Sequence, residues 1–118
     1  MRNICDTIEY DIIQWVTEYK EVSLVDVLGK SRKRNLFIAR MLISYCLLYR
    51  GVDTLETIGF KIGRDHSTVH YYKGIFIGGM DVLVNYELRM FALFLEKRGV
   101  ELPDLEAFKK RMEEINDK

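Results

Sequence analysis

Apolar residues recur three and four positions apart along most of the chain, which is the spacing of one face of an α-helix. The first stripe of this kind consists of Ile8, Ile12, Trp15 and Tyr19. Ser23 then stands three residues before Asp26, an arrangement close to a capping box, and Gly29 can end the short helix between them. The pattern therefore predicts an amphipathic helix followed by a short second one.

A basic connector, residues 30–35, leads into a long helical pattern over about 36–49. One face of this helix is marked by Leu36, Ala39, Ile43, Cys46, Leu47 and Arg50. Thr54 is a good N-cap for a short helix after the break at 51–53. Gly59 lies inside that short helix, at a place where another helix could approach closely.

Residues 54–77 have the layout of a helix-turn-helix: a short helix, a turn that contains glycine, and a second helix. Asp65 can cap the second helix. The residues spaced to face inward are Val69, Tyr72 and Phe76. Polar groups cluster in the first turn, at 64–68, where a recognition helix meets base edges and phosphates. This segment therefore predicts DNA contacts at the start of the second helix.

The last third of the chain predicts two further helices. The first runs from Asp81 to about Arg98, and its stripe consists of Val82, Tyr86, Met90, Leu93 and Phe94. The last spans about 103–117, with Pro103 in its first turn, and packs on the core or on a second subunit. Its inner face consists of Leu105, Phe108, Met112 and Ile115. With no strand pattern and no linker, we predict one all-α domain of seven helices over 1–118.

The distribution of charge along the chain says more about function than the overall composition does. The 118 residues include 48% apolar residues, enough for a core, and their 18 basic and 18 acidic side chains cancel. Residues 29–73, however, carry nine basic and three acidic residues, whereas both flanking segments are acidic. A basic centre is typical of an anion-binding face, although a solvated face gives the same count.

Several function classes lack support in the sequence. Cys5 and Cys46 provide neither a disulfide framework nor a zinc site, and no segment is apolar enough for a membrane span or a signal peptide. We expect a cytoplasmic protein. His66 and His70 are spaced for a metal pair, but no third ligand is evident, so we expect no metal and no cofactor. A nicking tyrosine at Tyr71 or Tyr72 is a further alternative, but no catalytic constellation accompanies it, and we expect no enzyme.

The run Gly63-Arg64-Asp65-His66-Ser67-Thr68-Val69 closely resembles the signature of the C-terminal DNA-binding domain of the bacterial replication initiator DnaA. That family has Gly-Arg-Asp-His-(Thr/Ser)-Thr-Val. Ile58-Gly59 and the short helix before the basic run match the same pattern. The similar region spans about 8–98, and the helix at 103–117 lies beyond the family's usual end. The chain contains no phosphate loop for a nucleotide, so it resembles a stand-alone version of the domain.

The resemblance implies an all-helical, Trp-repressor-like fold that binds double-stranded DNA with its recognition helix in the major groove. It implies that Arg32 or Arg34 of the basic loop reaches the minor groove. Base contacts would come from the positions of Asp65, His66 and Ser67, and base or backbone contacts from those of Arg64 and Thr68. We expect the DNA-binding residues to be Arg32, Arg34, Arg40, Arg64, Asp65, His66, Ser67, Thr68, Tyr71 and Lys73, with the basic ones on one face.

Two functions remain open from sequence. One is sequence-specific DNA binding, in replication initiation or its control. The other is a protein-interaction module with a DnaA-like fold whose DNA face has been lost or redirected. The neutral total charge favours the second function, as do Gly74, Ile75 and Phe76, which stand where the family usually has basic residues. Neither the DNA word nor the oligomeric state follows from the sequence.

Overall fold

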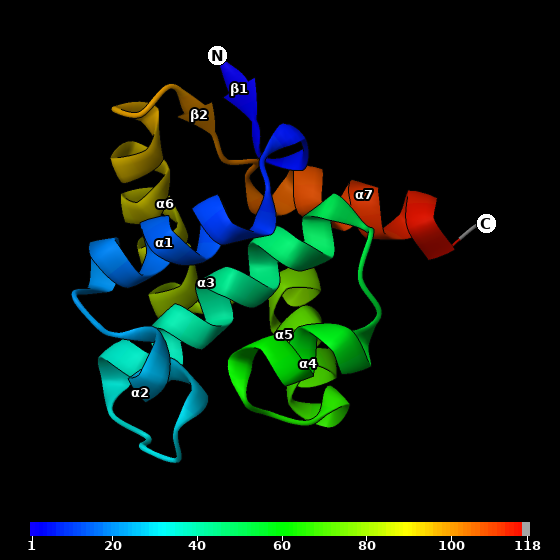
Figure 1. Ribbon diagram of the computed structural model, residues 1–118. Helices are drawn as coiled ribbons and strands as arrows, with labels where there is room; N and C mark the ends of the chain where they lie inside the picture. Colours follow the sequence, from blue (N-terminus) through cyan, green and yellow to red (C-terminus); the bar gives the residue numbers. More distant parts are fainter. Residues whose placement is uncertain (117–118) are drawn as a thin grey trace.

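The computed structural model describes residues 1–116, and in this range the chain is built almost entirely of helices (Figure 1). The helices are α1 (Glu9–Lys20), α2 (Leu24–Leu28), α3 (Arg34–Arg50), α4 (Leu55–Ile62), α5 (His66–Gly78), α6 (Val82–Glu96) and α7 (Leu105–Asn116), with a short 3₁₀ turn η1 (Ile4–Asp6) at the start. The all-α fold with seven α-helices in the described part is thus confirmed. No helix among the described residues is long and apolar enough to cross a membrane.

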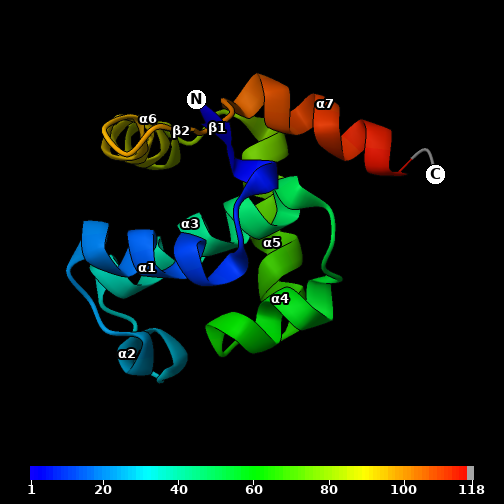
Figure 2. The ribbon, with the colours of Figure 1, turned by 45° about the horizontal axis from the view of Figure 1, so that its top comes forward.

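Helix α3 forms the centre of the molecule. Its residues from Ile38 to Leu48 are all buried, including the polar Arg40 and Ser44, so burial extends around the whole helix rather than along the predicted single face. Figure 2 shows α3 in the middle, with α6 on one side and with α2 and α4 on the other. Helix α3 therefore serves as the scaffold on which the helix-turn-helix, α4 and α5, is placed.

The sequence predicted the wrong side of α6 as its buried face. The side chains that α6 buries are Val84, Glu87, Leu88, Phe91 and Leu95, whereas most of the predicted stripe is exposed. Helix α6 packs on α1, where the ring of Tyr19 lies 5.3 Å from those of Phe91 and Phe94. The buried Glu87 pairs with Lys20 at 3.2 Å, so a carboxylate occupies the inner face. Apolar residues occur on both sides of this helix, and periodicity alone does not select between them.

Helix α7 packs on the core of the same chain. Phe108 stacks on Tyr45 of α3 at 4.7 Å and meets Phe76 of α5 edge-on at 5.3 Å. The side chain of Asp104 caps the helix by accepting from the backbone N–H of Ala107, so Pro103 precedes the cap and is not in the first turn as predicted. The structure also contains a parallel pair that the sequence did not predict, β1 (Arg2–Asn3) with β2 (Val100–Glu101).

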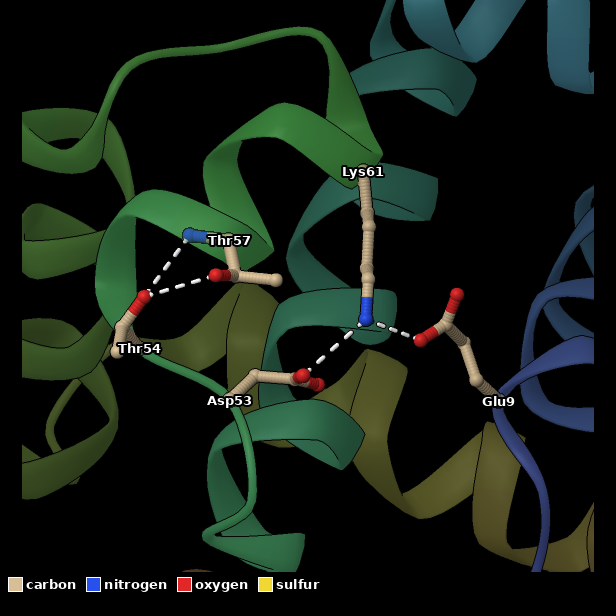
Figure 3. Close-up of polar contacts among 5 residues, drawn as sticks. All are labelled: Glu9, Asp53, Thr54, Thr57 and Lys61. Carbon is tan, nitrogen blue, oxygen red and sulfur yellow. Dashed lines mark hydrogen bonds and ion pairs between the residues drawn. The ribbon is translucent and has the colours of Figure 1, made fainter.

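Polar contacts fix α4 to the rest of the molecule (Figure 3). The ammonium group of Lys61 is bonded to a carboxylate oxygen of Glu9, at the start of α1, and lies 3.1 Å from one of Asp53, in the loop after α3. Thr54 caps α4 as predicted, with its hydroxyl accepting from the N–H of Thr57. The first helix of the helix-turn-helix is thus capped at its start by Thr54 and tied to α1 and to the loop after α3 by Lys61.

Candidate nucleic-acid interface

The turn of the helix-turn-helix is packed so closely that it leaves no room for a side chain at Gly59 or Gly63. A Cβ on Gly59 would lie 2.5 Å from the carbonyl oxygen of Arg64, so α4 and the turn touch backbone to backbone. The close approach predicted at Gly59 therefore exists, but it is made by the turn and not by another helix. Gly63 has a φ of +69°, and a Cβ there would lie 2.5 Å from the carbonyl oxygen of Leu28. The turn is thereby packed against the end of α2.

Asp65 caps α5 with only one of its two carboxylate oxygens. Its Oδ1 accepts from the backbone N–H groups of Ser67, at 2.9 Å, and Thr68, at 3.2 Å, and also from the Ser67 hydroxyl. Within the described part of the chain, no hydrogen bond uses Oδ2. The hydrogen bond from the Ser67 hydroxyl, followed by the one from Thr68, lowers the pKa of Asp65 below its ordinary value. Asp65 is therefore a cap that retains a free, charged acceptor.

The first two turns of α5 present a polar surface to solvent. His66, Ser67, His70 and Tyr71 are exposed, and Thr68 and Lys73 are half-buried. His70 lies one turn after His66 on the same side of the helix, so it joins the candidate residues; the i, i+4 spacing of the two histidines was the signal in the sequence. Phe76 is buried and Ile75 packs on the core, so these two residues do not form an apolar binding surface.

Arg40 lies inside the protein rather than on the surface where we expected it. Only 2% of this residue is exposed, and its guanidinium donates to the carbonyl oxygens of Val27, Ser31, Asp26 and Gly29 at 2.7 to 3.1 Å. Burial, followed by the nearby charge of Arg64, lowers the pKa of Arg40. Since all four acceptors belong to 26–31, Arg40 holds the end of α2 and the basic loop in one conformation.

Arg64 links this loop to the helix-turn-helix. Its Nη1 donates to the carbonyl oxygen of Gly29 at 2.9 Å and to that of its neighbour Gly63 at 2.7 Å. The Gly29 carbonyl therefore accepts from both Arg40 and Arg64. This shared acceptor fixes the basic loop relative to the turn that precedes α5, although the two segments are far apart in sequence.

Four of the predicted arginines line one hollow of about 400 Å³ between the basic loop and α5. Its lining residues are Arg32, Arg34, Phe37, Arg40, Arg64 and Tyr72. This lining has no carboxylate, and none of the ion pairs found within 1–116 involves these arginines. We call this hollow the arginine pocket. Phe37, whose ring lies 5.8 Å from that of Tyr72, was not among the predicted site residues.

The arginine pocket and the first turn of α5 have the chemistry of an anion-binding surface. Guanidinium groups without counter-ions suit phosphate oxygens, and exposed Asp, His, Ser and Tyr side chains suit the edges of bases. The described residues contain no group of three or more side chains placed to hold a metal ion. The arrangement therefore suits binding to a polyanion.

Comparisons with known proteins agree with this arrangement. A family model described as "Bacterial dnaA protein helix-turn-helix" matches residues 10–74. A chromosomal replication initiator protein DnaA from Tropheryma whipplei is 33% identical over 61 residues, which cover 52% of this chain. The protein "Chromosomal replication initiator protein DnaA 2" from Chlamydia pneumoniae is 37% identical over 60 residues, or 51% of this chain. Each match spans only 13% of the relative. No solved structure gives a significant match.

Proposed function

The chain belongs to the bacterial DnaA helix-turn-helix family, and from this premise we propose that it binds a specific double-stranded DNA sequence in replication initiation or its control. The observation that carries the proposal is the bond from Arg64 to the Gly29 carbonyl, which joins two surfaces of different chemistry. One is the arginine pocket, which suits the DNA backbone. The other is the first turn of α5, which suits base edges.

In the proposed complex, the start of α5 enters the major groove. Asp65, His66 and Ser67 face bases there, with His70 and Tyr71 one turn further along the helix. The free Oδ2 of Asp65 is an acceptor for a cytosine amino group. Thr68 and Lys73, which are half-buried, contact the backbone or the edge of the groove.

The basic loop follows the neighbouring backbone in this proposal. Arg32 and Arg34 are exposed and lie at the pocket without an ion-pair partner within the described residues, so one of them reaches the adjacent minor groove or both neutralise phosphates. Arg40 has a different role from the one predicted. Because its guanidinium is engaged by backbone carbonyls, it is a positioning residue that holds the loop in place and does not contact DNA.

The experiment that tests the proposal is selection of bound sequences from a random pool of duplexes at physiological salt, followed by measurement of Kd for the selected duplex. We expect one enriched sequence and a Kd at least about a thousandfold lower than for an unrelated duplex. Arg32→Ala should weaken binding to both duplexes, because it removes a cation from the pocket. Arg89→Ala, which removes an exposed arginine of α6, is the matched control and should leave both values unchanged.

The outcomes separate the two functions left open by the sequence. If no duplex were bound even at low salt, DNA binding would be excluded, and a protein partner for this surface would be the remaining function. If binding occurred without an enriched sequence, the protein would bind DNA only through its backbone. A loss on Arg89→Ala equal to that on Arg32→Ala would show that total charge, and not the arginine pocket, determines affinity.

A further inference from the structure

Helix α6 has an apolar stripe that no described part of the chain covers. Its exposed members are Val82 (83% exposed), Tyr86 (57%), Leu93 (49%) and Met90 (36%). The half-buried Leu83 and Phe94 border the stripe on the side where the helix packs against its neighbours. A row of apolar side chains along roughly three turns of one helix is more than the scattered exposure that is normal at a protein surface.

The stripe is symmetric about Leu88 in the sequence. Three of its residues precede Leu88 by six, five and two positions (Val82, Leu83 and Tyr86), and three follow it by the same intervals (Phe94, Leu93 and Met90). When two identical helices pair antiparallel about a two-fold axis, each residue meets the one at the mirrored position of the other copy. An axis that passes between Tyr86 and Met90, at the level of Leu88 but on the side opposite its buried side chain, therefore matches apolar with apolar at every position of the stripe.

The surface beside the stripe provides space for such a pair. A hollow of about 600 Å³ adjoins the second half of the stripe and is lined by Tyr19, Met90, Leu93, Phe94, Glu96 and Lys97. In the antiparallel arrangement, Val82 and Tyr86 of a second copy point toward Phe94 and Met90 at this hollow. Each copy thus offers both a projecting half and a hollow half, which a two-fold interface requires.

The charges are consistent with this pairing. Asp81 precedes the stripe and Lys97 follows it, and both are exposed, so an antiparallel pair brings the Asp81 end of one copy toward the Lys97 end of the other. Antiparallel packing also sets the two helix dipoles in opposite directions, which is the favourable orientation. The chain has no net charge, so two copies approach without overall repulsion.

We propose that the protein self-associates through α6, with two copies pairing antiparallel about an axis that passes between Tyr86 and Met90. One helix face is smaller than the roughly 800 Å² that each partner of a stable complex commonly buries, so the free protein should associate weakly, at micromolar or higher concentration. Neither the arginine pocket nor the start of α5 takes part, so the paired protein keeps its proposed DNA surface free. The proposal does not depend on DNA binding.

The test is sedimentation equilibrium of the whole chain without DNA, at concentrations up to the millimolar range. We expect a reversible monomer–dimer equilibrium in the parent protein. Val82→Asn should weaken it by at least about tenfold, because each dimer would bury two side-chain amides without hydrogen-bond partners. Val25→Asn is the matched control: Val25 is 79% exposed and also lies in the first turn of a helix, so this change should leave the equilibrium as in the parent.

A mixing experiment tests the register itself. Tyr86→Glu and Met90→Lys should each impair self-association alone, whereas an equimolar mixture of the two variants should associate again. Only in the mixed pair does the new carboxylate face the new ammonium group, while Met90 of the first variant faces Tyr86 of the second. Circular dichroism should confirm that each variant is folded. A parent protein that stays monomeric, an effect of Val25→Asn equal to that of Val82→Asn, or a mixture that fails to associate would each overturn the proposal.

Discussion

At the scale of single residues, Asp65 shows how one side chain serves fold and surface together. Its Oδ1 receives the hydrogen bonds that start α5, whereas no described residue bonds to Oδ2. The sequence predicts both helix capping and base contact for this aspartate. The geometry makes a separate oxygen atom available for each role.

The two roles can be separated by substitution. Asp65→Asn keeps an oxygen that can cap α5 but removes the charge, and Asp65→Ala removes both. If Oδ2 accepts from a base, both variants should bind the selected duplex roughly tenfold to a hundredfold more weakly, with unrelated duplexes bound as before or better. Kd for both duplexes and thermal unfolding would be measured together. An Asp65→Asn protein with the parent's specificity would show that Asp65 is a cap alone.

At the scale of elements, the structure depends on how closely the helix-turn-helix is packed. Gly59 and Gly74 both lie inside helices, in α4 and α5, and the sequence predicts a close approach only at Gly59. The space around them differs completely, because a Cβ at Gly59 would meet the backbone of the turn, while nothing lies within 4 Å of one at Gly74.

Alanine at these two positions should therefore have opposite effects. Gly59→Ala should lower the free energy of unfolding by about 1–3 kcal/mol, because the turn at Arg64 must move. Gly74→Ala should raise it by about 0.5–1 kcal/mol, because alanine is the better helix former and meets no obstacle. Urea unfolding of both variants provides the measurement. If the two changed stability in the same direction, the proposed contact between α4 and the turn would not be the cause.

The contacts of Lys61 predict how much this residue contributes to the stability of the folded protein. Burial opposes its charge, but hydrogen bonds to Glu9 and Asp53 outweigh burial and raise the pKa of Lys61. Lys61→Met leaves Asp53, already with one buried oxygen lacking a partner, without its ammonium contact, so we expect a loss of about 1–3 kcal/mol at neutral pH. Arg2→Met breaks a more exposed ion pair, with Asp11, and should cost less than about 1 kcal/mol.

The raised pKa of Lys61 also predicts how the effect of Lys61→Met on the free energy of unfolding changes with pH. A raised pKa in the folded protein means that the stabilisation is fully present below the ordinary lysine pKa of 10.5 and is lost as pH rises through the raised value. The difference in unfolding free energy between the parent and Lys61→Met should therefore be constant near neutral pH and shrink in strongly alkaline solution. Urea titrations at several pH values would measure it. A difference that grew with pH would contradict the proposed contacts.

The sequence predicts some of these elements well and others poorly, for physical reasons. The inner face of α5 was predicted correctly because polar residues occupy its outer side. The phase of α6 was missed because apolar residues occur on both of its sides and the buried face includes Glu87. Arg40 was placed on the surface because a sequence shows a charge but not the backbone carbonyls that surround it. The β1–β2 pair of two-residue strands is too short to leave a pattern.

At the scale of the whole molecule, the arginines of the pocket form a local basic surface, while the ion pairs of the described residues lie elsewhere. The total charge is zero, yet the arginine pocket has no carboxylate in its lining. Acidic groups pair elsewhere, as Glu87 does with Lys20 and Glu18 with Arg98 on the α1–α6 side. A ligand at the pocket therefore meets a local positive field that the total charge does not reveal.

This local field predicts the salt dependence of DNA binding. Arg40 is engaged inside the protein, so the cations free to neutralise phosphates are chiefly Arg32, Arg34, Arg64 and Lys73. With about four phosphates neutralised, the logarithm of the association constant should fall with the logarithm of salt concentration at a slope of about −3 to −4. Arg34→Ala should make the slope less steep by about 1, whereas Lys109→Ala, on α7, should not change it. Titrations of a labelled duplex at several salt concentrations would measure these slopes. A parent slope near zero would contradict the phosphate contacts, since a neutral protein without a local basic surface releases no counter-ions on binding.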